Sequence, residues 1–137
     1  MKVSRLAVSI AVVGLGVAPL LAVAPQADAA AAAKAKCRVG ANPARVQIAV
    51  GANGLAPGTA QFQVTAGANA SSVLTNAVDA LGDAAAEWDS AIAVGDVAEG
   101  TRGTIAADFV AAGGTVTATV SQGSVVVATA SATCGAK

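Results

Sequence analysis

The sequence predicts an all-β domain, an antiparallel β-sandwich of about seven strands, preceded by a signal peptide helix. Three observations lead to this prediction. Apolar and polar residues alternate with a period of two in several short runs, which is the pattern of half-buried strands. Clusters of Gly, Pro, Asn and Ser separate these runs and favour tight turns. Two cysteines lie near the two ends of the alternating region and offer a covalent link across it.

The first residues have the organisation of an export signal. Lys2 and Arg5 precede an uncharged apolar run over residues 6–18, and small residues follow. Ala27-Asp28-Ala29 fits the small-x-small rule of signal peptidase, which places the cleavage between Ala29 and Ala30. The alternative is an uncleaved membrane helix, but Pro19 interrupts it. We therefore expect a secreted, extracellular protein that is not in the membrane after cleavage.

Three segments follow from this interpretation. Residues 1–29 are the signal peptide, residues 30–36 a flexible alanine- and lysine-rich leader, and residues 37–135 the β-sandwich domain.

Cys37 and Cys134 are expected to form a disulfide, because export exposes thiols to an oxidising compartment. Closing so long a loop stabilises a fold by about 4–5 kcal/mol on the chain-entropy model. The alternative is a reactive or metal-binding thiol pair. The chain has no histidine and no C-x-x-C motif, so ligands for such a site are missing.

The expected strands cover residues 45–50, 61–66, 115–120 and 125–134. Residues 51–54 and 57–58 form turns between the first two, and residues 121–124 form a tight hairpin between the last two. The last strand is expected to place one alternating set of residues on a single face, with the cysteine pointing inward: Val126, Ala128, Ala130, Ala132 and Cys134.

Residues 72–94 allow two interpretations. Apolar residues recur there at the spacing of one helical face, but Gly82 in the middle disfavours a helix. The interpretation we favour is a strand over residues 73–78, a turn over residues 79–83 and a second strand over residues 84–92.

The expected core is thin, because the chain is 55% apolar but much of this is alanine. Its largest members are the three aromatic residues Phe62, Trp88 and Phe109. Trp88 lies between two acids, so the alternative to burial is an exposed ligand contact.

Residues 46–67 resemble the opening of bacterial immunoglobulin-like (Ig-like) domains of the invasin and intimin type, in which a strand leads through Asn-Gly and Pro-Gly turns into a strand with a Phe. Residues 75–90 are similar to the next turn of those domains, an Asp-x-x-Gly step into a strand, and residues 114–120 are similar to their penultimate strand. The resemblance implies an Ig-like sandwich, here in single copy behind a signal peptide. The family usually occurs in tandem arrays and lacks an end-to-end cysteine pair, so only the fold is carried over.

The residues for catalysis are largely missing. There is no histidine, nucleophile elbow, phosphate loop or dinucleotide motif. The acids could supply a glycosidase pair or a calcium site, but they lack EF-hand spacing and favour a solvated surface: Asp79, Asp83, Glu87, Asp89, Asp96, Glu99 and Asp108. No enzyme, cofactor or metal is expected, and the net charge of zero with few aromatic residues disfavours nucleic acid as a partner.

The function that fits these observations is a monomeric, non-enzymatic binding module of the cell surface or extracellular space. Its partner is an unknown extracellular protein or cell-wall ligand, bound through loops at one end of the domain. One alternative is a secreted small-molecule carrier with a sandwich cleft, resembling the enediyne-binding apoproteins of actinomycetes, although those have two short-range disulfides. The other alternative is a protease inhibitor, although no loop is braced by a nearby disulfide.

Overall fold

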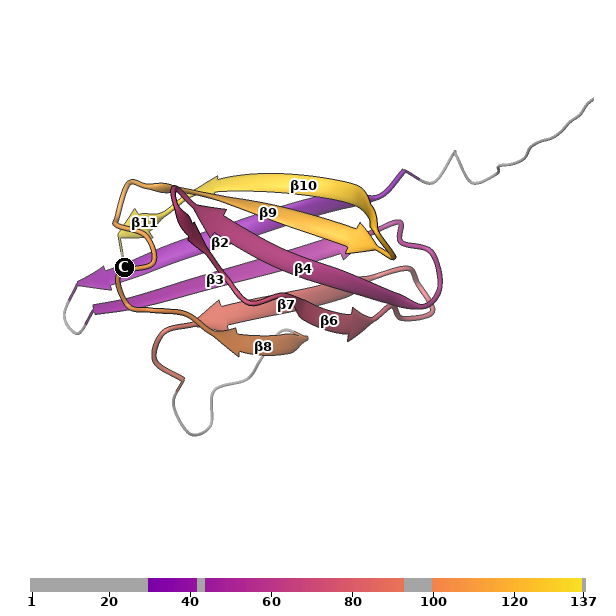
Figure 1. The fold of residues 1–137 in the computed structure, drawn as a ribbon, viewed down its shortest axis with the longest axis horizontal. Coiled ribbons are helices and arrows are strands. Elements are labelled where there is room, and N and C mark those ends of the chain that lie inside the picture. The colour runs from indigo at the N-terminus through magenta and orange to yellow at the C-terminus, as the bar shows by residue number, and fades with distance from the viewer. Residues whose placement is uncertain (1–29, 42–43, 93–99, 137) are drawn as a thin grey trace, which may run out of the picture. The chain divides into compact units, whose positions relative to one another are not determined.

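Two β-sheets face each other in a sandwich in the computed structural model, which describes residues 30–41, 44–92 and 100–136 (Figure 1). The β3 sheet has the order β11 (Gly135–Ala136), β2 (Ala32–Ala41), β3 (Ala44–Asn53), β7 (Ala84–Asp89) and β8 (Thr101–Thr104). The β9 sheet has the order β10 (Val125–Thr133), β9 (Thr115–Gln122), β4 (Thr59–Ala66) and β5 (Asn69–Ala70), with β6 (Leu74–Ala77) also on β4. The predicted all-β sandwich is confirmed.

Alternating sequence produces the central strands. In β3 the side chains of Val46, Ile48 and Val50 are buried, whereas the residues between them face outward. The strands β4 and β9 repeat this pattern and contribute Phe62 and Val120 to the same core. Each inward set faces the other sheet, so the two apolar faces bury each other as in other sandwiches.

The strand β2 corrects the expectation of a flexible leader. Residues 32–36 form its first half and pair with β3, from Ala32 opposite Asn53 to Ala41 opposite Ala44. Ala33 and Ala35 pack against the core while Lys34 and Lys36 point outward. An alanine face is small enough to lie close to the opposing sheet, so the segment is ordered despite its weak hydrophobicity. Residues 1–29, which the sequence predicts to be a signal peptide, lie outside the described residues.

Residues 72–92 contain two strands and no helix, so the helical alternative is wrong, and the second strand ends at Asp89 instead of residue 92. The strands β6 and β7 flank a turn over residues 79–83, and Gly82 adopts a φ of 83° that a helix does not allow. Trp88 and Ala86 point into the core from β7, whereas Leu81 is 83% exposed. The helical spacing of apolar residues therefore came from residues that lie on different faces. Residues 93–94 are outside the described part of the chain.

The last long strand has an irregularity that the sequence pattern does not show. A register shift between Val126 and Ala128 interrupts the regular pairing of β10 with β9. Ala128, Ala130 and Ala132 keep the predicted inward face, but Val126 is exposed, which corrects its predicted place. The predicted hairpin is confirmed, with Gly123 at a φ of 65° in its turn.

The described residues form ten strands, more than the sequence pattern predicts. The additional strands are short: β5 and β11 have two residues each, and β8 has four. Two of the pairings are parallel, β11 with β2 and β7 with β8, and the others are antiparallel. Such short segments offer too few residues for a period to be recognised.

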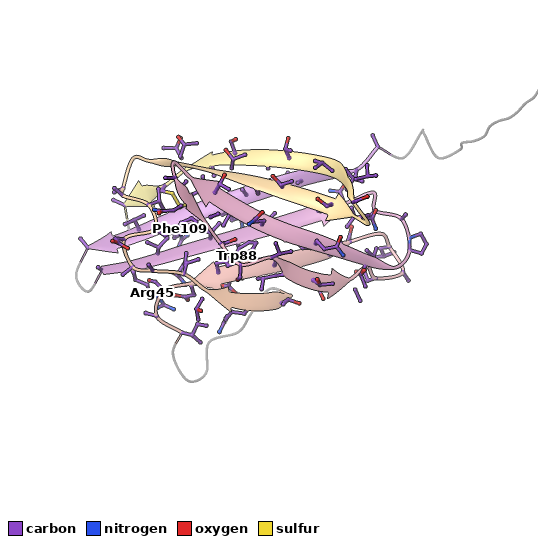
Figure 2. All side chains as sticks on the ribbon, in the orientation of Figure 1. Arg45, Trp88 and Phe109 are labelled. Carbon is purple, nitrogen blue, oxygen red and sulfur yellow. A yellow bond between two sulfur atoms is a disulfide. The ribbon has the colours of Figure 1, made fainter. Side chains whose placement is uncertain are left out.

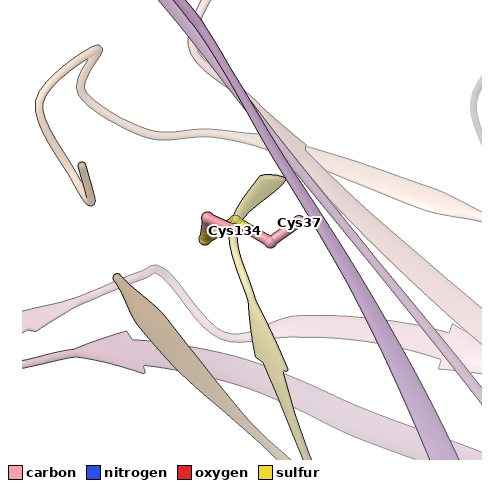
Figure 3. Close-up of a disulfide and its surroundings, with 2 residues drawn as sticks. All are labelled: Cys37 and Cys134. Atoms are coloured by element: carbon pink, nitrogen blue, oxygen red, sulfur yellow. A yellow bond between two sulfur atoms is a disulfide. The ribbon is translucent and has the colours of Figure 1, made fainter. Parts of the chain in front are cut away.

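The predicted disulfide is present, and it lies where the chain changes sheets (Figure 3). Cys37 is in the middle of β2, and Cys134 follows β10 immediately before β11 joins β2. Their Cα atoms are 4.5 Å apart, and both residues are buried. Phe62, Trp88 and Phe109 are buried as well (Figure 2 labels the last two).

Candidate functional site

Charge is distributed unequally over the two sheets. All five lysine and arginine residues in the described ranges lie on strands of the β3 sheet, at positions that alternate with the buried ones: Lys34, Lys36, Arg38, Arg45 and Arg102. The strands of the β9 sheet contain no charged residue, and their outward positions are mostly Thr, Ser and Gln. One outer face of the sandwich is therefore charged and the other is neutral.

Asp89 and Arg45 form an ion pair on the charged face. The guanidinium donates to both carboxylate oxygens, Nε to Oδ1 at 3.0 Å and Nη2 to Oδ2 at 2.6 Å. Gln47 and the backbone N–H of Ala91 also donate to this carboxylate, which has no exposed surface. The hydrogen bonds from Arg45, above all, lower the pKa of Asp89, against the opposing effect of burial.

Glu87 and Arg102 form a second pair on the same face. Arg102 donates to Glu87 at 3.2 Å across the parallel β7–β8 pairing, and both side chains are largely buried. In contrast, Lys34, Lys36 and Arg38 on β2 are exposed, and the described residues offer them no ion pair closer than 4 Å. The positive charge that is not neutralised is thus concentrated on β2.

A hollow of about 550 Å³ opens on this face beside Lys34. Its floor consists of small residues, Gly51, Ala85 and Gly100, and Asp79 and Asp83 lie on its far side. Gly51 is opposite Lys34 on one side and Ala85 on the other. Because these positions have almost no side chain, the middle of the face is lower than its edges.

A second, smaller hollow of about 240 Å³ follows along the same strand, lined by Lys36, Arg38, Ala49 and Glu87. Ala49 and Gly51 are successive outward positions of β3, so the two hollows lie one after the other beside the cations of β2. We call this pair of hollows the β3 trough.

The turn over residues 79–83 is rigid for a surface turn. The Oδ1 atom of Asp79 accepts hydrogen bonds from the backbone N–H groups of Leu81 and Asp83, both at 2.9 Å. The backbones of Asp79 and Asp83 pair as well, and Gly82 donates to the carbonyl of Asp79. Asp side chains favour such turns because they replace backbone partners. The turn therefore holds the apolar side chain of Leu81 in solvent.

Hydrogen bonds join this turn to two others at the same end of the sandwich. Leu55 donates to the carbonyl of Gly82 at 3.0 Å. The side-chain amide of Gln122 forms two hydrogen bonds with the backbone of Ala56, accepting from its N–H and donating to its carbonyl. We call residues 53–58, 79–83 and 122–125 the loop end; Figure 1 shows the three turns together. Besides Leu81 it exposes Val125, which is 62% accessible.

The structure separates most of the acidic residues that the sequence offered for a glycosidase pair or a calcium site. Asp79 and Asp83 share the turn, Glu87 and Asp89 have arginine partners, and Asp108 lies beside Phe109 between β8 and β9. Asp96 and Glu99 lie outside the described residues. Within the described ranges, no three acids or cysteines come together as metal ligands would.

Sequence reasoning missed the charged face, and it placed binding on loops at one end of the domain without identifying which loops. The alternation of a small residue with a cation over residues 33–38 was the available signal for the charged strand, because it has the period of two. The hydrogen bonds of Gln122 to Ala56 and of Leu55 to Gly82 join residues far apart in the chain, and no local sequence pattern predicts them.

The chain matches no protein-family model, no curated protein and no solved structure. Among the described residues, no helix has the length and apolar character needed to cross a membrane.

Proposed function

We propose that this chain is a secreted, monomeric, non-enzymatic Ig-like module that binds an extracellular protein through the loop end. The observation on which this rests is the set of hydrogen bonds that ties three turns together beneath exposed apolar side chains. Binding surfaces gain affinity when their loops are already ordered, because less conformational entropy is lost on association.

Leu81 is the residue expected to contribute most to binding. An isolated exposed apolar residue is normal on a protein surface, but Leu81 combines 83% exposure with a turn fixed by Asp79. A side chain held in this way can enter a pocket of a partner without first being ordered. Val125 and Pro57 extend the apolar surface on the neighbouring turns.

Two further observations support secretion and the Ig-like assignment. The Cys37–Cys134 disulfide fits an oxidising compartment, and residues 1–29 have the pattern of a signal peptide. The two-sheet architecture is compatible with the resemblance of residues 46–67 to invasin-type Ig-like domains.

Secretion is tested by the intact mass of the protein from the culture supernatant. We expect a species that begins at Ala30 and takes up two alkyl groups only after reduction. Full-length protein found only with membranes would contradict secretion and the assignment of residues 1–29.

Binding through the loop end is tested by photo-crosslinking on the mature protein. A photoreactive amino acid replaces Leu81 in one variant and Val73 in a control, since Val73 is also exposed, at 55%, but lies outside the loop end. Both are incubated with surface and secreted proteins of the source culture. We expect one protein to be crosslinked at position 81 and not at 73, and its retention by the unmodified module to fall in Leu81→Ser. Equal crosslinking at both positions, or none at 81, overturns the proposal.

A second candidate function is a small-molecule carrier, which the hollow of about 550 Å³ favours because its volume is typical of ligand sites. Native mass spectrometry of the secreted protein tests it. An added mass that disappears on denaturation supports a carrier, and a bare mass matching the sequence counts against one.

A further inference from the structure

We propose that the β3 trough binds a linear anionic polysaccharide whose acidic groups lie against Lys34, Lys36 and Arg38. The three cations lie outside the loop end, which the larger hollow meets only at Asn53, Asp79 and Asp83. The inference therefore goes beyond the proposed function and does not depend on it.

The distribution of charge on this face favours an anionic ligand at β2. Arg45 on β3 and Arg102 on β8 are paired with Asp89 and Glu87, whereas the three cations of β2 have no ion-pair partner among the described residues. An exposed cation that already has a carboxylate partner gains little from a second anion. The three on β2 are therefore the groups of this face with the most to gain from an anionic ligand.

The spacing of the three cations favours an extended ligand. Alternate residues of a strand are about 6.5 Å apart on one face, so the three cations form a line of about 13 Å. The trough runs beside this line, because its floor residues Ala49 and Gly51 lie on the neighbouring strand, opposite Lys36 and Lys34. A straight row of charges beside two successive open hollows fits an extended polymer better than a compact anion.

Among the described residues, the outward positions that line the trough carry no large apolar and no aromatic side chain. The outward residues of β3 and β7 that lie in the trough are small, polar or charged, namely Gln47, Ala49, Gly51, Ala85 and Glu87, and Asp79 and Asp83 also line the larger hollow. An anionic membrane is bound best when apolar side chains insert beside the cations. A single-stranded nucleic acid needs aromatic platforms, and all three aromatic residues are buried. A hydrophilic sugar chain needs neither.

The test uses the mature protein with heparin and polygalacturonate as sulfated and carboxylated probes, and with dextran as the neutral one. We expect binding to both acidic polymers and none to dextran. The affinity should fall with salt, and Lys36→Gln should lower the slope of log K against log salt by about one, as expected when one ionic contact is lost. Backbone NMR shifts should localise to β2 and β3.

A charge-matched variant separates a site from a general charge effect. Lys36→Gln/Asp108→Asn restores the wild-type net charge by a change between β8 and β9, away from the trough. We expect it to bind as weakly as Lys36→Gln alone. Recovery of wild-type affinity overturns the proposal, and so does tighter binding to single-stranded DNA or to phosphatidylglycerol vesicles than to either polysaccharide.

The two proposals fail independently. Leu81→Ser is expected to leave heparin binding unchanged, and Lys36→Gln is expected to leave crosslinking at position 81 unchanged. If either variant loses both activities, its disulfide content and far-UV spectrum show whether it is still folded.

Discussion

Arg45 and Asp89 are 44 residues apart in the chain, yet the guanidinium of one holds both carboxylate oxygens of the other on the outer face of the β3 sheet. Asp89 is fully buried while the Arg45 side chain is 22% exposed. The pair therefore lies at the boundary of solvent and interior, where losing the cation would leave a buried charge without its main partner.

We predict that Arg45→Ala lowers the free energy of unfolding by about 3–5 kcal/mol, the usual cost of removing one partner from a buried ion pair. Urea denaturation of the disulfide-intact protein measures it. Lys36→Ala is the control, because Lys36 is an exposed cation of the same face, and we expect it to change stability by less than about 0.5 kcal/mol. Equal effects of the two substitutions would contradict a specific role of the pair.

Acid stability follows from the lowered pKa of Asp89. The folded pKa lies below the unfolded value, so the carboxylate stabilises the fold above the unfolded pKa, and this contribution is lost as pH falls through the folded pKa. We expect the contribution of Asp89 to be complete above about pH 5 and to decline below about pH 4. Asp89→Asn should be less stable at pH 7 and should show a shallower acid decline. An unchanged acid profile in that variant would falsify this assignment.

Removal of the disulfide should have a large effect on stability. Cys37 and Cys134 close a loop with a separation of 97 residues. We expect Cys37→Ala/Cys134→Ala to lose about 4–5 kcal/mol on the chain-entropy model. The measurement is urea denaturation with and without a reductant. The reductant should destabilise the wild type and have no effect on the variant, and sensitivity of the variant would point to a cause other than this bond.

Gly100 is predicted to be intolerant of a side chain. It has a φ of 80°, and a Cβ there would collide with the backbone carbonyl of Ala85. Gly67→Ala is the matched control, because Gly67 also has a positive φ, of 58°, but open space around it. We expect a cost of about 1–2 kcal/mol for the control, from backbone conformation alone, and a larger cost for Gly100→Ala. Similar melting temperatures for the two variants would show that the close approach is relieved.

Gln122→Ala should release one turn of the loop end without unfolding the domain. The side-chain amide is the partner of both backbone polar groups of Ala56. Hydrogen exchange at the Ala56 amide should become about tenfold faster, which corresponds to one hydrogen bond. Exchange at Val64, whose backbone N–H donates to the hydroxyl of the buried Ser71 at 3.0 Å, is the internal reference and should not change.

The sequence predicted the sandwich well where side chains are large enough to mark a face. Val46, Ile48 and Val50 alternate visibly, and so do the residues around Phe62. Prediction failed where the inward residue is alanine, as in the first half of β2, because alanine is compatible with a strand, a helix or a tail. The prediction was also wrong at Val126, because a β-bulge changes which face the side chains point to and no sequence pattern indicates the bulge.

The candidate surfaces were harder to predict for a different reason. The cations of β2 and the carboxylates of β7 form one face only after non-adjacent strands are paired. The order β2-β3-β7-β8 is a property of the folded chain, and no run of residues encodes it locally. The same holds for the tie between Gln122 and Ala56, which are 66 residues apart.

The bond between Cys37 and Cys134 also has a mechanical consequence. Tension applied through the segments before β2 and after β10 would pass directly between the two sulfur atoms, so the 97-residue loop between them would bear none of it. With the bond intact, the sandwich would behave as an inextensible link. Once the bond is reduced, the same pull could draw out roughly 330 Å of chain, at about 3.4 Å per residue.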